Sequence, residues 1–450
     1  MRRNRYKALV DSLTVEIRAG KLPPGTRLPT HRHLAAKEGI ALVTASRIYA
    51  ELAAKGLVSG ETGRGTFVRE LVLSAGHGID QQATAPEMLD LSFNYPALPE
   101  QTELLRAALR RIASSGDLEA LLRYQPHAGR SHEREIIARH VASRGLPATA
   151  DQVLIVNGAQ HGLASVIMAM LAPGDVVAVD SLTYSGFKAL AEMQRLELLP
   201  IPFTDEGPDL NELDALCLKR KVRAVYVMPT LHNPLGWVMS LEQRRELTLI
   251  AHRHQLLIIE DASYAFLVDN APAPVAALAP ESTIYVSGFS KSMATGLRVG
   301  YVVAPVRWVP SIERAIRTTT WNTPSLMTAI ACEWIEDGTV VRMEVEKRKD
   351  ARVRQALVRK ILDGLVLSSH PASYFVWIHL PLEVRADQVV AQLFAANIAV
   401  SSAEPFATSK HVPHAIRLAL GSVALDQLEQ ALQRVASAIY DFSCGVVSSH

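Results

Sequence analysis

The order of apolar and polar positions in the first seventy residues predicts three short helices and a hairpin. Apolar residues at helical spacing indicate helices over residues 6–19, 31–38 and 43–55, and a glycine follows each one. Two alternating runs, residues 57–59 and 65–69, flank a glycine-rich tip at residues 61–64. This order is typical of a winged helix-turn-helix, whose third helix enters the major groove of DNA.

From about residue 150 the pattern changes to short apolar runs separated by helical stretches. We expect a helix over residues 158–170, and strands over 153–156, 176–179, 222–228, 256–260 and 282–287. Runs that are apolar throughout are typical of a mostly parallel sheet with helices on both faces. Ligands of such sheets bind at the carboxyl ends of the strands, so the polar residues that follow each strand are candidates for a site.

A chain of 450 residues is too long for one ordinary domain. We predict a winged helix over residues 1–70, a linker over 71–88 and an α/β body over 89–450. Within the body we expect a large domain over about 121–325. A small α+β domain would combine about 89–120 with 326–440.

Charge separates the first part of the chain from the rest. Residues 1–70 hold 13 basic and 6 acidic residues, a net charge of +7, and the remaining 34 basic and 39 acidic residues give −5. A basic head on a mildly acidic body is typical of a nucleic-acid-binding module joined to another domain. A head that only docks on its neighbour remains an alternative.

Composition excludes several other classes of protein. No run of about 18 apolar residues predicts a membrane span, and no signal peptide follows the basic start, so we expect a cytoplasmic protein. The three cysteines are far apart, which argues against a disulfide framework. The two His-Arg-His triplets lack further ligands at zinc spacing, so we expect no metal site.

Head residues near the predicted helix starts and the hairpin tip are candidates for DNA contacts. Thr30 is a plausible N-cap of the second helix, where backbone N–H groups can meet phosphate. Arg64 lies at the hairpin tip, from which its guanidinium could reach phosphate or the minor groove. The full set is Thr30, His31, Arg32, Thr44, Ser46, Arg47 and Arg64.

The polar residues after the body strands match the needs of pyridoxal 5′-phosphate (PLP). Its aldehyde needs an amine, and Lys291 can form the Schiff base. Its ring nitrogen needs a carboxylate to stay protonated, which Asp261 can supply. Asn233 and Tyr264 can donate hydrogen bonds to the ring's phenolic oxygen, and Tyr184 can cover one face of the ring.

The phosphate of PLP needs a helix N-terminus, hydroxyl groups and an arginine. The candidates are Gly158, Ala159, Gln160, Ser287, Ser290 and Arg298. Each signal is weak by itself, because a lone Ser-x-x-Ser-Lys is most often a surface loop. The combination in this order is what indicates PLP.

The body resembles the class I aminotransferases of PLP fold type I. The matching motifs are Asn233-Pro-x-Gly, Asp261-x-x-Tyr264, Ser287-x-x-Ser290-Lys291 with Arg298, Tyr124-x-x-x-x-Gly129 and Ile416-Arg417-Leu418. The resemblance implies that Tyr124 reaches the cofactor of a second subunit, hence a homodimer, and that Arg417 clamps a substrate carboxylate. Ala262 stands where related regulators carry a second acid after the Asp.

The head resembles the GntR family of regulators. The match runs through Gly25-Thr-Arg-Leu-Pro-Thr-His-Arg32, Tyr49-x-x-Leu52 and Gly63-Arg-Gly-Thr-Phe-Val68. Ala41-Leu42 departs from the family's usual Ser-Arg, and Arg47 could replace that arginine.

A GntR head on an aminotransferase-like body resembles the MocR subfamily. The resemblance implies a transcriptional regulator that binds an operator in double-stranded DNA and senses PLP or an amino acid or amine effector through Lys291. The alternatives are a catalytically active aminotransferase with an accessory head, because no residue essential for transamination is missing, and a protein that stores PLP.

Overall fold

A seven-stranded sheet forms the centre of the body in the computed structural model. The structure describes residues 2–18, 21–22, 25–54, 57–61, 65–68, 88–115, 118–204, 206–382, 384–409 and 412–445. The sheet order is β4-β12-β11-β10-β9-β5-β6, with β4 (Val153–Val156), β5 (Val176–Asp180), β6 (Glu197–Ile201), β9 (Val222–Val227), β10 (Leu257–Asp261), β11 (Thr283–Gly288) and β12 (Gly300–Val303). Only β12 pairs antiparallel with its neighbours, which confirms the predicted mostly parallel sheet.

Helices cover both faces of this sheet because alternate residues of each strand point to opposite sides. In β5, Val177 and Val179 belong to one hydrophobic cluster, whereas Val176 and Ala178 belong to another. Each buried valine contributes about 1.5–3 kcal/mol of hydrophobic free energy. The covering helices are α6 (Ser131–Ala142), α7 (Gly158–Met170), α8 (Ser185–Met193), α9 (Leu210–Lys219), α10 (Leu241–His254), α11 (Val275–Leu278), α12 (Val309–Thr319) and α13 (Ser325–Glu336).

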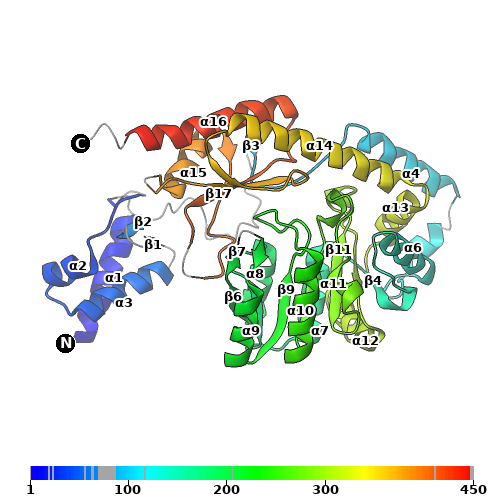
Figure 1. The fold of residues 1–450 in the computed structure, drawn as a ribbon, viewed down its shortest axis with the longest axis horizontal. Helices are drawn as coiled ribbons and strands as arrows, with labels where there is room; N and C mark the ends of the chain where they lie inside the picture. The colour runs from blue at the N-terminus through cyan, green and yellow to red at the C-terminus, as the bar shows by residue number, and fades with distance from the viewer. Residues whose placement is uncertain are drawn as a thin grey trace.

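A second, antiparallel sheet forms a smaller unit, with strand order β13-β14-β17-β16. Its strands are β13 (Val366–Ser368), β14 (Phe375–His379), β16 (Ser401–Ser402) and β17 (Ala415–Ala419), and its helices are α14 (Thr339–Ile361), α15 (Ala386–Ala395) and α16 (Leu425–Gly445). In Figure 1, α14 and α16 lie along the same side of the molecule, above the seven-stranded sheet. Two short parallel strands, β3 (Leu89–Asp90) and β15 (Ile398–Ala399), join the chain after the linker to this unit.

Helix α4 (Gln101–Ser115) lies in the stretch predicted for the small domain. Its buried Ala108 nevertheless belongs to the hydrophobic cluster that contains Val153 and Ile155 of β4. The predicted division of the chain into domains stays a prediction. The remaining short elements are α5 (Leu118–Leu121), β7 (Phe203–Thr204), β8 (Gly207–Pro208), η1 (Ala150–Gln152), η2 (Ala265–Leu267), η3 (Thr295–Leu297) and η4 (Val306–Trp308).

The N-terminal unit has the predicted winged helix-turn-helix fold. It contains α1 (Arg2–Arg18), α2 (His31–Glu38), α3 (Leu42–Ala54), β1 (Val58–Glu61) and β2 (Gly65–Val68). Val10, Leu34 and Ile48, one from each helix, are buried together. Thr30 caps α2, because its side-chain oxygen accepts a hydrogen bond from the His33 backbone N–H at 3.2 Å.

The N-terminal unit lies beside α15 of the smaller unit (Figure 1). The guanidinium of Arg385 lies 3.7 Å from the ring centre of Phe67 in β2, a cation–π contact. Asp387 holds that guanidinium through two hydrogen bonds of 2.9 and 2.6 Å. Arg385 is buried, so this contact is shielded from water.

Candidate functional site

A cavity of about 220 Å³ lies where β9, β10 and β11 end. Ten of the residues predicted from the sequence line it: Ala159, Gln160, Tyr184, Asn233, Asp261, Tyr264, Ser290, Lys291, Arg298 and Arg417. Nine of them come from segments that the seven-stranded sheet brings to one edge, and Arg417 comes from β17 of the antiparallel sheet. Open α/β sheets typically bind their ligands at this edge.

Lys291 lies on the loop after β11 and reaches into the cavity. Its Nζ donates a hydrogen bond to the backbone oxygen of Asn94 at 2.6 Å. Burial, with smaller contributions from the charges of Arg417 and Arg298, lowers the pKa of Lys291 to about 8. The lower pKa raises the fraction of neutral amine at neutral pH, and the neutral amine is the form that attacks a carbonyl carbon.

Asp261 is the last residue of β10 and is buried at the floor of the cavity. Its Oδ2 accepts a hydrogen bond from the Tyr226 hydroxyl at 3.0 Å. Its Oδ1 accepts from the Ser263 backbone N–H at 3.0 Å and the Ser263 hydroxyl at 2.6 Å. Burial raises the pKa of Asp261, and these hydrogen bonds oppose the rise. The carboxylate is therefore fixed in direction and ready to pair with a positively charged ring nitrogen.

The N-terminus of α7 and Arg298 form the polar end of the cavity. Arg298 donates to the Ser290 hydroxyl at 3.2 Å and to the Asn157 backbone oxygen at 3.1 Å. Gly158 begins α7 with φ +79°, and a Cβ added to it would lie 2.6 Å from an Arg298 nitrogen. Only glycine lets the guanidinium lie this close to the helix N-terminus, where backbone N–H groups favour an anion.

Substitution of Gly158 by alanine should weaken PLP binding, because the new methyl group must displace Arg298. We expect the dissociation constant of PLP to rise about tenfold or more, or about 1.4 kcal/mol, measured by titrating the protein with PLP. Gly174→Ala is the matched control, since Gly174 has φ +89° but nothing within 4 Å of an added Cβ. Equal PLP affinity in the two variants would show that Arg298 does not bind the cofactor.

Arg417, in β17, forms the opposite end of the cavity. It is buried, and its guanidinium carbon lies 5.5 Å from the ring centre of Phe375 and 4.9 Å from that of Phe406. Nη1 lies 3.5 Å from the side-chain oxygen of Asn233, and Nη2 donates to the Ser401 hydroxyl at 3.2 Å. Burial lowers the pKa of Arg417 to about 10, so it stays positively charged at neutral pH.

Three of the predicted residues, Gly158, Ser287 and Tyr124, do not line this cavity. Ser287 is buried below it, and its hydroxyl donates to the Ala262 backbone oxygen at 3.2 Å. Tyr124 lies outside the cavity of its own chain: it is 84% exposed, with its ring 5.5 Å from that of Trp321. Gly158 contacts Arg298, which lines the cavity: a Cβ added to it would lie 2.6 Å from an Arg298 nitrogen.

Sequence reasoning missed the segment 92–95 (Ser92, Phe93, Asn94 and Tyr95), which forms one wall of the cavity. The backbone oxygen of Ser92 accepts a hydrogen bond from Arg417, as that of Asn94 does from Lys291. The segment follows β3, whose pairing with residues 398–399 no local pattern reveals. The aromatic and amide residues at positions 93–95, a few residues after the linker, are the signal that the sequence offers.

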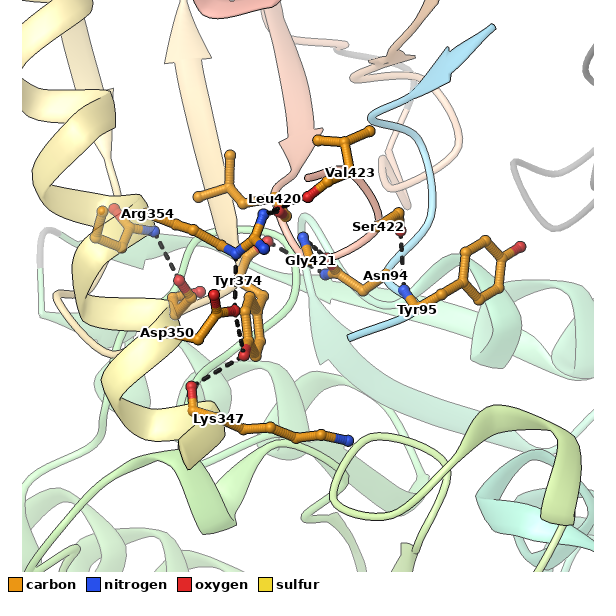
Figure 2. A network of polar contacts seen from close by, with 12 residues as sticks. Asn94, Tyr95, Lys347, Asp350, Arg354, Tyr374, Leu420, Gly421, Ser422 and Val423 are labelled. Atoms are coloured by element: carbon orange, nitrogen blue, oxygen red, sulfur yellow. Dashed lines mark hydrogen bonds and ion pairs between the residues drawn. The ribbon is translucent and has the colours of Figure 1, made fainter. Parts of the chain in front are cut away.

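A second buried lysine, Lys347 of α14, holds the loop that carries Lys291. Its Nζ donates to the backbone oxygens of Lys291 at 2.9 Å and Met293 at 2.7 Å. Burial lowers the pKa of Lys347 to about 7. Figure 2 shows Lys347 at one end of a polar network that also contains Tyr374 and Asn94. The network ties α14 to the segment 92–95.

In the N-terminal unit, several residues that are predicted to contact DNA also contact neighbouring side chains. His31 Nδ1 lies 3.0 Å from the Ser46 hydroxyl, and the Arg47 guanidinium lies 5.0 Å from the ring centre of Tyr6. Arg32 is exposed at the start of α2, and Thr44 lies in the first turn of α3. Arg64 lies outside the described residues.

Two other features, a metal site and a membrane-spanning helix, concern the part of the chain that the structure describes. No group of three His, Cys, Asp or Glu residues there could hold a metal ion. Within the same ranges, no helix combines the length and apolar character needed to cross a membrane.

Comparison with known families gives the evolutionary context of this site. The family model described as "Aminotransferase class I and II" matches residues 86–435. The chain belongs to the aminotransferase class I and II family. The model of the gntR family of bacterial regulatory proteins matches residues 5–68. This aminotransferase-family member therefore carries a gntR-type head, the layout implied by the MocR resemblance.

Two relatives align with almost the whole of this chain, including both the head and the body. The uncharacterized HTH-type transcriptional regulator YdeF of Bacillus subtilis is 27% identical over 430 residues, which cover 95% of this chain and 92% of YdeF. The uncharacterized HTH-type transcriptional regulator YjiR of Escherichia coli is 25% identical over 465 residues, covering 97% and 99%.

A solved structure supports the fold of the aminotransferase-like body. LysN, an α-aminoadipate aminotransferase from Thermus thermophilus, matches with a TM-score of 0.73 at 23% identity, covering 80% of this chain and 94% of that chain. That structure is described as a complex with N-(5′-phosphopyridoxyl)-L-leucine. At this identity the likeness shows the fold alone.

Proposed function

We propose that this protein is a cytoplasmic, PLP-dependent transcriptional regulator of the MocR type that binds an operator in double-stranded DNA and senses PLP or an amino compound at Lys291. One observation carries the proposal. Segment 92–95, which forms one wall of the cavity, follows β3, the first strand of the body after the linker from the gntR-type head. A ligand that moves this wall therefore acts on the chain that leads to the DNA-binding unit.

The residues of the cavity fit PLP. When bound, PLP supplies an aldehyde that captures amines and a ring that withdraws electrons. Lys291 would hold the aldehyde carbon, and Asp261 would keep a proton on the ring nitrogen. Asn233 and Tyr264 would donate to the phenolic oxygen, and Tyr184 would cover the ring. The residues that would hold the phosphate are Ala159, Gln160, Ser290 and Arg298, all of which line the cavity, while Ser287 donates a hydrogen bond to the Ala262 backbone oxygen.

A ligand can switch the protein only if it binds two states with different affinity. In the described structure Ser92 and Asn94 offer backbone oxygens to Arg417 and Lys291. A ligand carboxylate on Arg417 would compete with the Ser92 oxygen, and a changed partner at Lys291 would release the Asn94 oxygen. Both changes would remove hydrogen bonds that hold segment 92–95 in its present position. The ligand would therefore bind this state more weakly than a state in which the segment has moved, and this is the difference in affinity that a switch requires.

Operator affinity with and without amino compounds tests this function. The probes are DNA duplexes selected by the PLP-loaded, full-length protein from a random pool, and the amino compounds are those that shift its visible absorbance. We expect these compounds to change operator affinity about fivefold or more, a coupling free energy of about 1 kcal/mol. Unchanged operator affinity under saturating amino compound would overturn the proposal.

A catalytically active aminotransferase is the second candidate, favoured by the completeness of the site. Lys291, Asp261, Asn233, Tyr264 and Arg417 all line the cavity. Rapid transfer of an amino group to a 2-oxo acid, without specific DNA binding at moderate salt, would support this candidate against the regulator.

DNA contacts by the head should appear in the salt dependence of binding. Each arginine that neutralises a phosphate contributes about one unit to the slope of log K against log salt. We expect Arg32→Ala and Arg64→Ala each to reduce the slope by about one, measured by fluorescence anisotropy. Arg220→Ala, an exposed arginine of the body, is the control. Slopes equal to that of the control would argue against contacts by α2 and the hairpin tip.

We also infer a homodimer. Tyr124 lies on the surface with Trp321, which is 46% exposed, and the ring of His127 lies 4.9 Å from that of Trp321. Leu122 nearby in the sequence is 88% exposed. Exposed apolar groups that gather in this way are typical of a protein–protein interface. The aminotransferase resemblance implies that Tyr124 reaches the cofactor of the second subunit, and its exposure here supports the proposed dimer.

A further inference from the structure

The positive charges of the cavity limit the ligands that it can take. Among the lining residues, all of which the structure describes, the cations are Lys291, Arg298 and Arg417. Lys291 and Arg298 serve the cofactor, because one carries the amine and the other lies at the N-terminus of α7. Within this chain, Arg417 is the cation that remains for the ligand.

Arg417 is built to bind one carboxylate. Its Nε is buried and has no hydrogen-bond partner in the described structure, and its Nη2 is held by the Ser401 hydroxyl. A carboxylate that replaced the Ser92 oxygen could accept hydrogen bonds from Nε and Nη2 together, the two-point geometry that arginine favours. The buried, unpaired Nε would gain the partner that it lacks.

The wall beside Lys291 is aromatic and uncharged. The rings of Phe93 and Tyr95 are stacked, with centres 6.1 Å apart, and Lys291 Nζ lies 6.0 Å from the Tyr95 ring centre. A ligand held by its amine near Lys291 and its carboxylate on Arg417 would place its side chain near these rings. A second carboxylate there would lose hydration without gaining a cation, which is costly.

We propose that the cavity selects 2-amino acids with one carboxylate and a neutral, apolar or aromatic side chain, and that Phe93 and Tyr95 determine this specificity. The proposal rests on the proposed PLP function, since the amine must be captured next to Lys291. It goes beyond that function because it names the class of ligand and the residues that select it.

Titration of the visible absorbance of the PLP-loaded, full-length protein tests the proposal. The ligands are L-methionine, L-leucine and L-phenylalanine, against L-glutamate, L-2-aminoadipate and 3-methylbutylamine, which lacks a carboxylate. We expect the neutral amino acids to bind at least about tenfold more tightly than the acidic ones, a difference of about 1.4 kcal/mol. The amine should bind more weakly than leucine, because it leaves Arg417 without a carboxylate.

Variants of the aromatic wall separate specificity from cofactor binding. Phe93→Ala and Tyr95→Ala should weaken the neutral amino acids and leave the visible band of bound PLP unchanged. Tyr95→Arg should shift the preference toward glutamate, because it adds the missing cation. Phe203→Ala, an exposed aromatic residue outside the cavity, is the matched control.

The possible outcomes distinguish this proposal from the function on which it rests. Acidic amino acids that bind as tightly as neutral ones would overturn the ligand class and leave the PLP function standing, as would happen if a second subunit supplied a cation. A PLP-loaded protein whose absorbance responds to no amino compound would overturn the proposed sensing function, and the ligand class with it.

Discussion

The Lys291→Ala variant is expected to lose the visible absorbance of bound PLP completely. The carbon–nitrogen double bond that gives this absorbance needs the lysine amine, and alanine supplies none. The response of operator affinity to amino compounds should weaken with it, because PLP that has no covalent attachment to the chain is held less tightly. Absorbance spectra of the PLP-treated protein and operator titrations with and without ligand measure the two effects.

Lys347 provides the matched control for this experiment. It is a second buried lysine beside the same loop, but its Nζ bonds the backbone oxygens of Lys291 and Met293 instead of facing the cavity. Lys347→Gln retains a hydrogen-bond donor and should retain the visible band. A band that persists in Lys291→Ala and vanishes in Lys347→Gln would show that the two lysines were assigned the wrong way round.

The Asp261→Asn variant is expected to bind PLP about 10- to 100-fold more weakly. Hydrogen bonds to a charged group contribute about 1.5–3 kcal/mol, and asparagine cannot keep the ring nitrogen protonated by its charge. Asparagine is close to aspartate in shape, so the fold around β10 should survive. Titration of the cofactor-free variant with PLP gives the affinity, and circular dichroism checks the fold.

Tyr226→Phe is the control for Asp261. It removes one of three hydrogen bonds to the carboxylate but leaves the charge in place. We expect it to weaken PLP binding less than about tenfold, in line with the roughly 1 kcal/mol of a neutral hydrogen bond. Asp261→Asn protein that binds PLP as tightly as the wild type would mean that the carboxylate does not face the ring nitrogen.

The sheet and most of the cavity could be predicted from the sequence because their signals are local. Each apolar run is a buried strand, and the residue after it must lie at the carboxyl edge of the sheet. This rule predicts that Asp261, Asn233 and Lys291 lie near that edge, and the combination of their motifs indicates PLP. The cap at Thr30 is local in the same way, and the structure confirms it.

The segment 92–95 could not be predicted, because its place depends on contacts far along the chain. Asn94 donates to the Tyr374 backbone oxygen at 3.2 Å and accepts from the Gly421 backbone N–H at 2.9 Å. Tyr95 is held by the Ser422 hydroxyl at 2.9 Å, as Figure 2 shows. Partners about 280 to 330 residues away leave no pattern in the sequence around residue 94.

For Ser287, a local motif predicted a role that the structure does not support: the residue does not line the cavity. The Ser-x-x-Ser-Lys pattern makes both serines candidates for the phosphate. Ser287 is still within β11, so the pleat of the strand directs its side chain to the Ala262 backbone. Ser290 lies beyond the end of the strand, where it lines the cavity.

The contact between Phe67 and Arg385 has a consequence for the length of the operator. Because this buried contact seats β2 against the start of α15, the small unit sets the direction in which α3 points. In the proposed dimer, two heads seated this way would meet DNA half-sites at one fixed separation. Any rotation of the small unit would then change the spacing between half-sites that the protein accepts, and leave its preference for bases within each half-site unchanged.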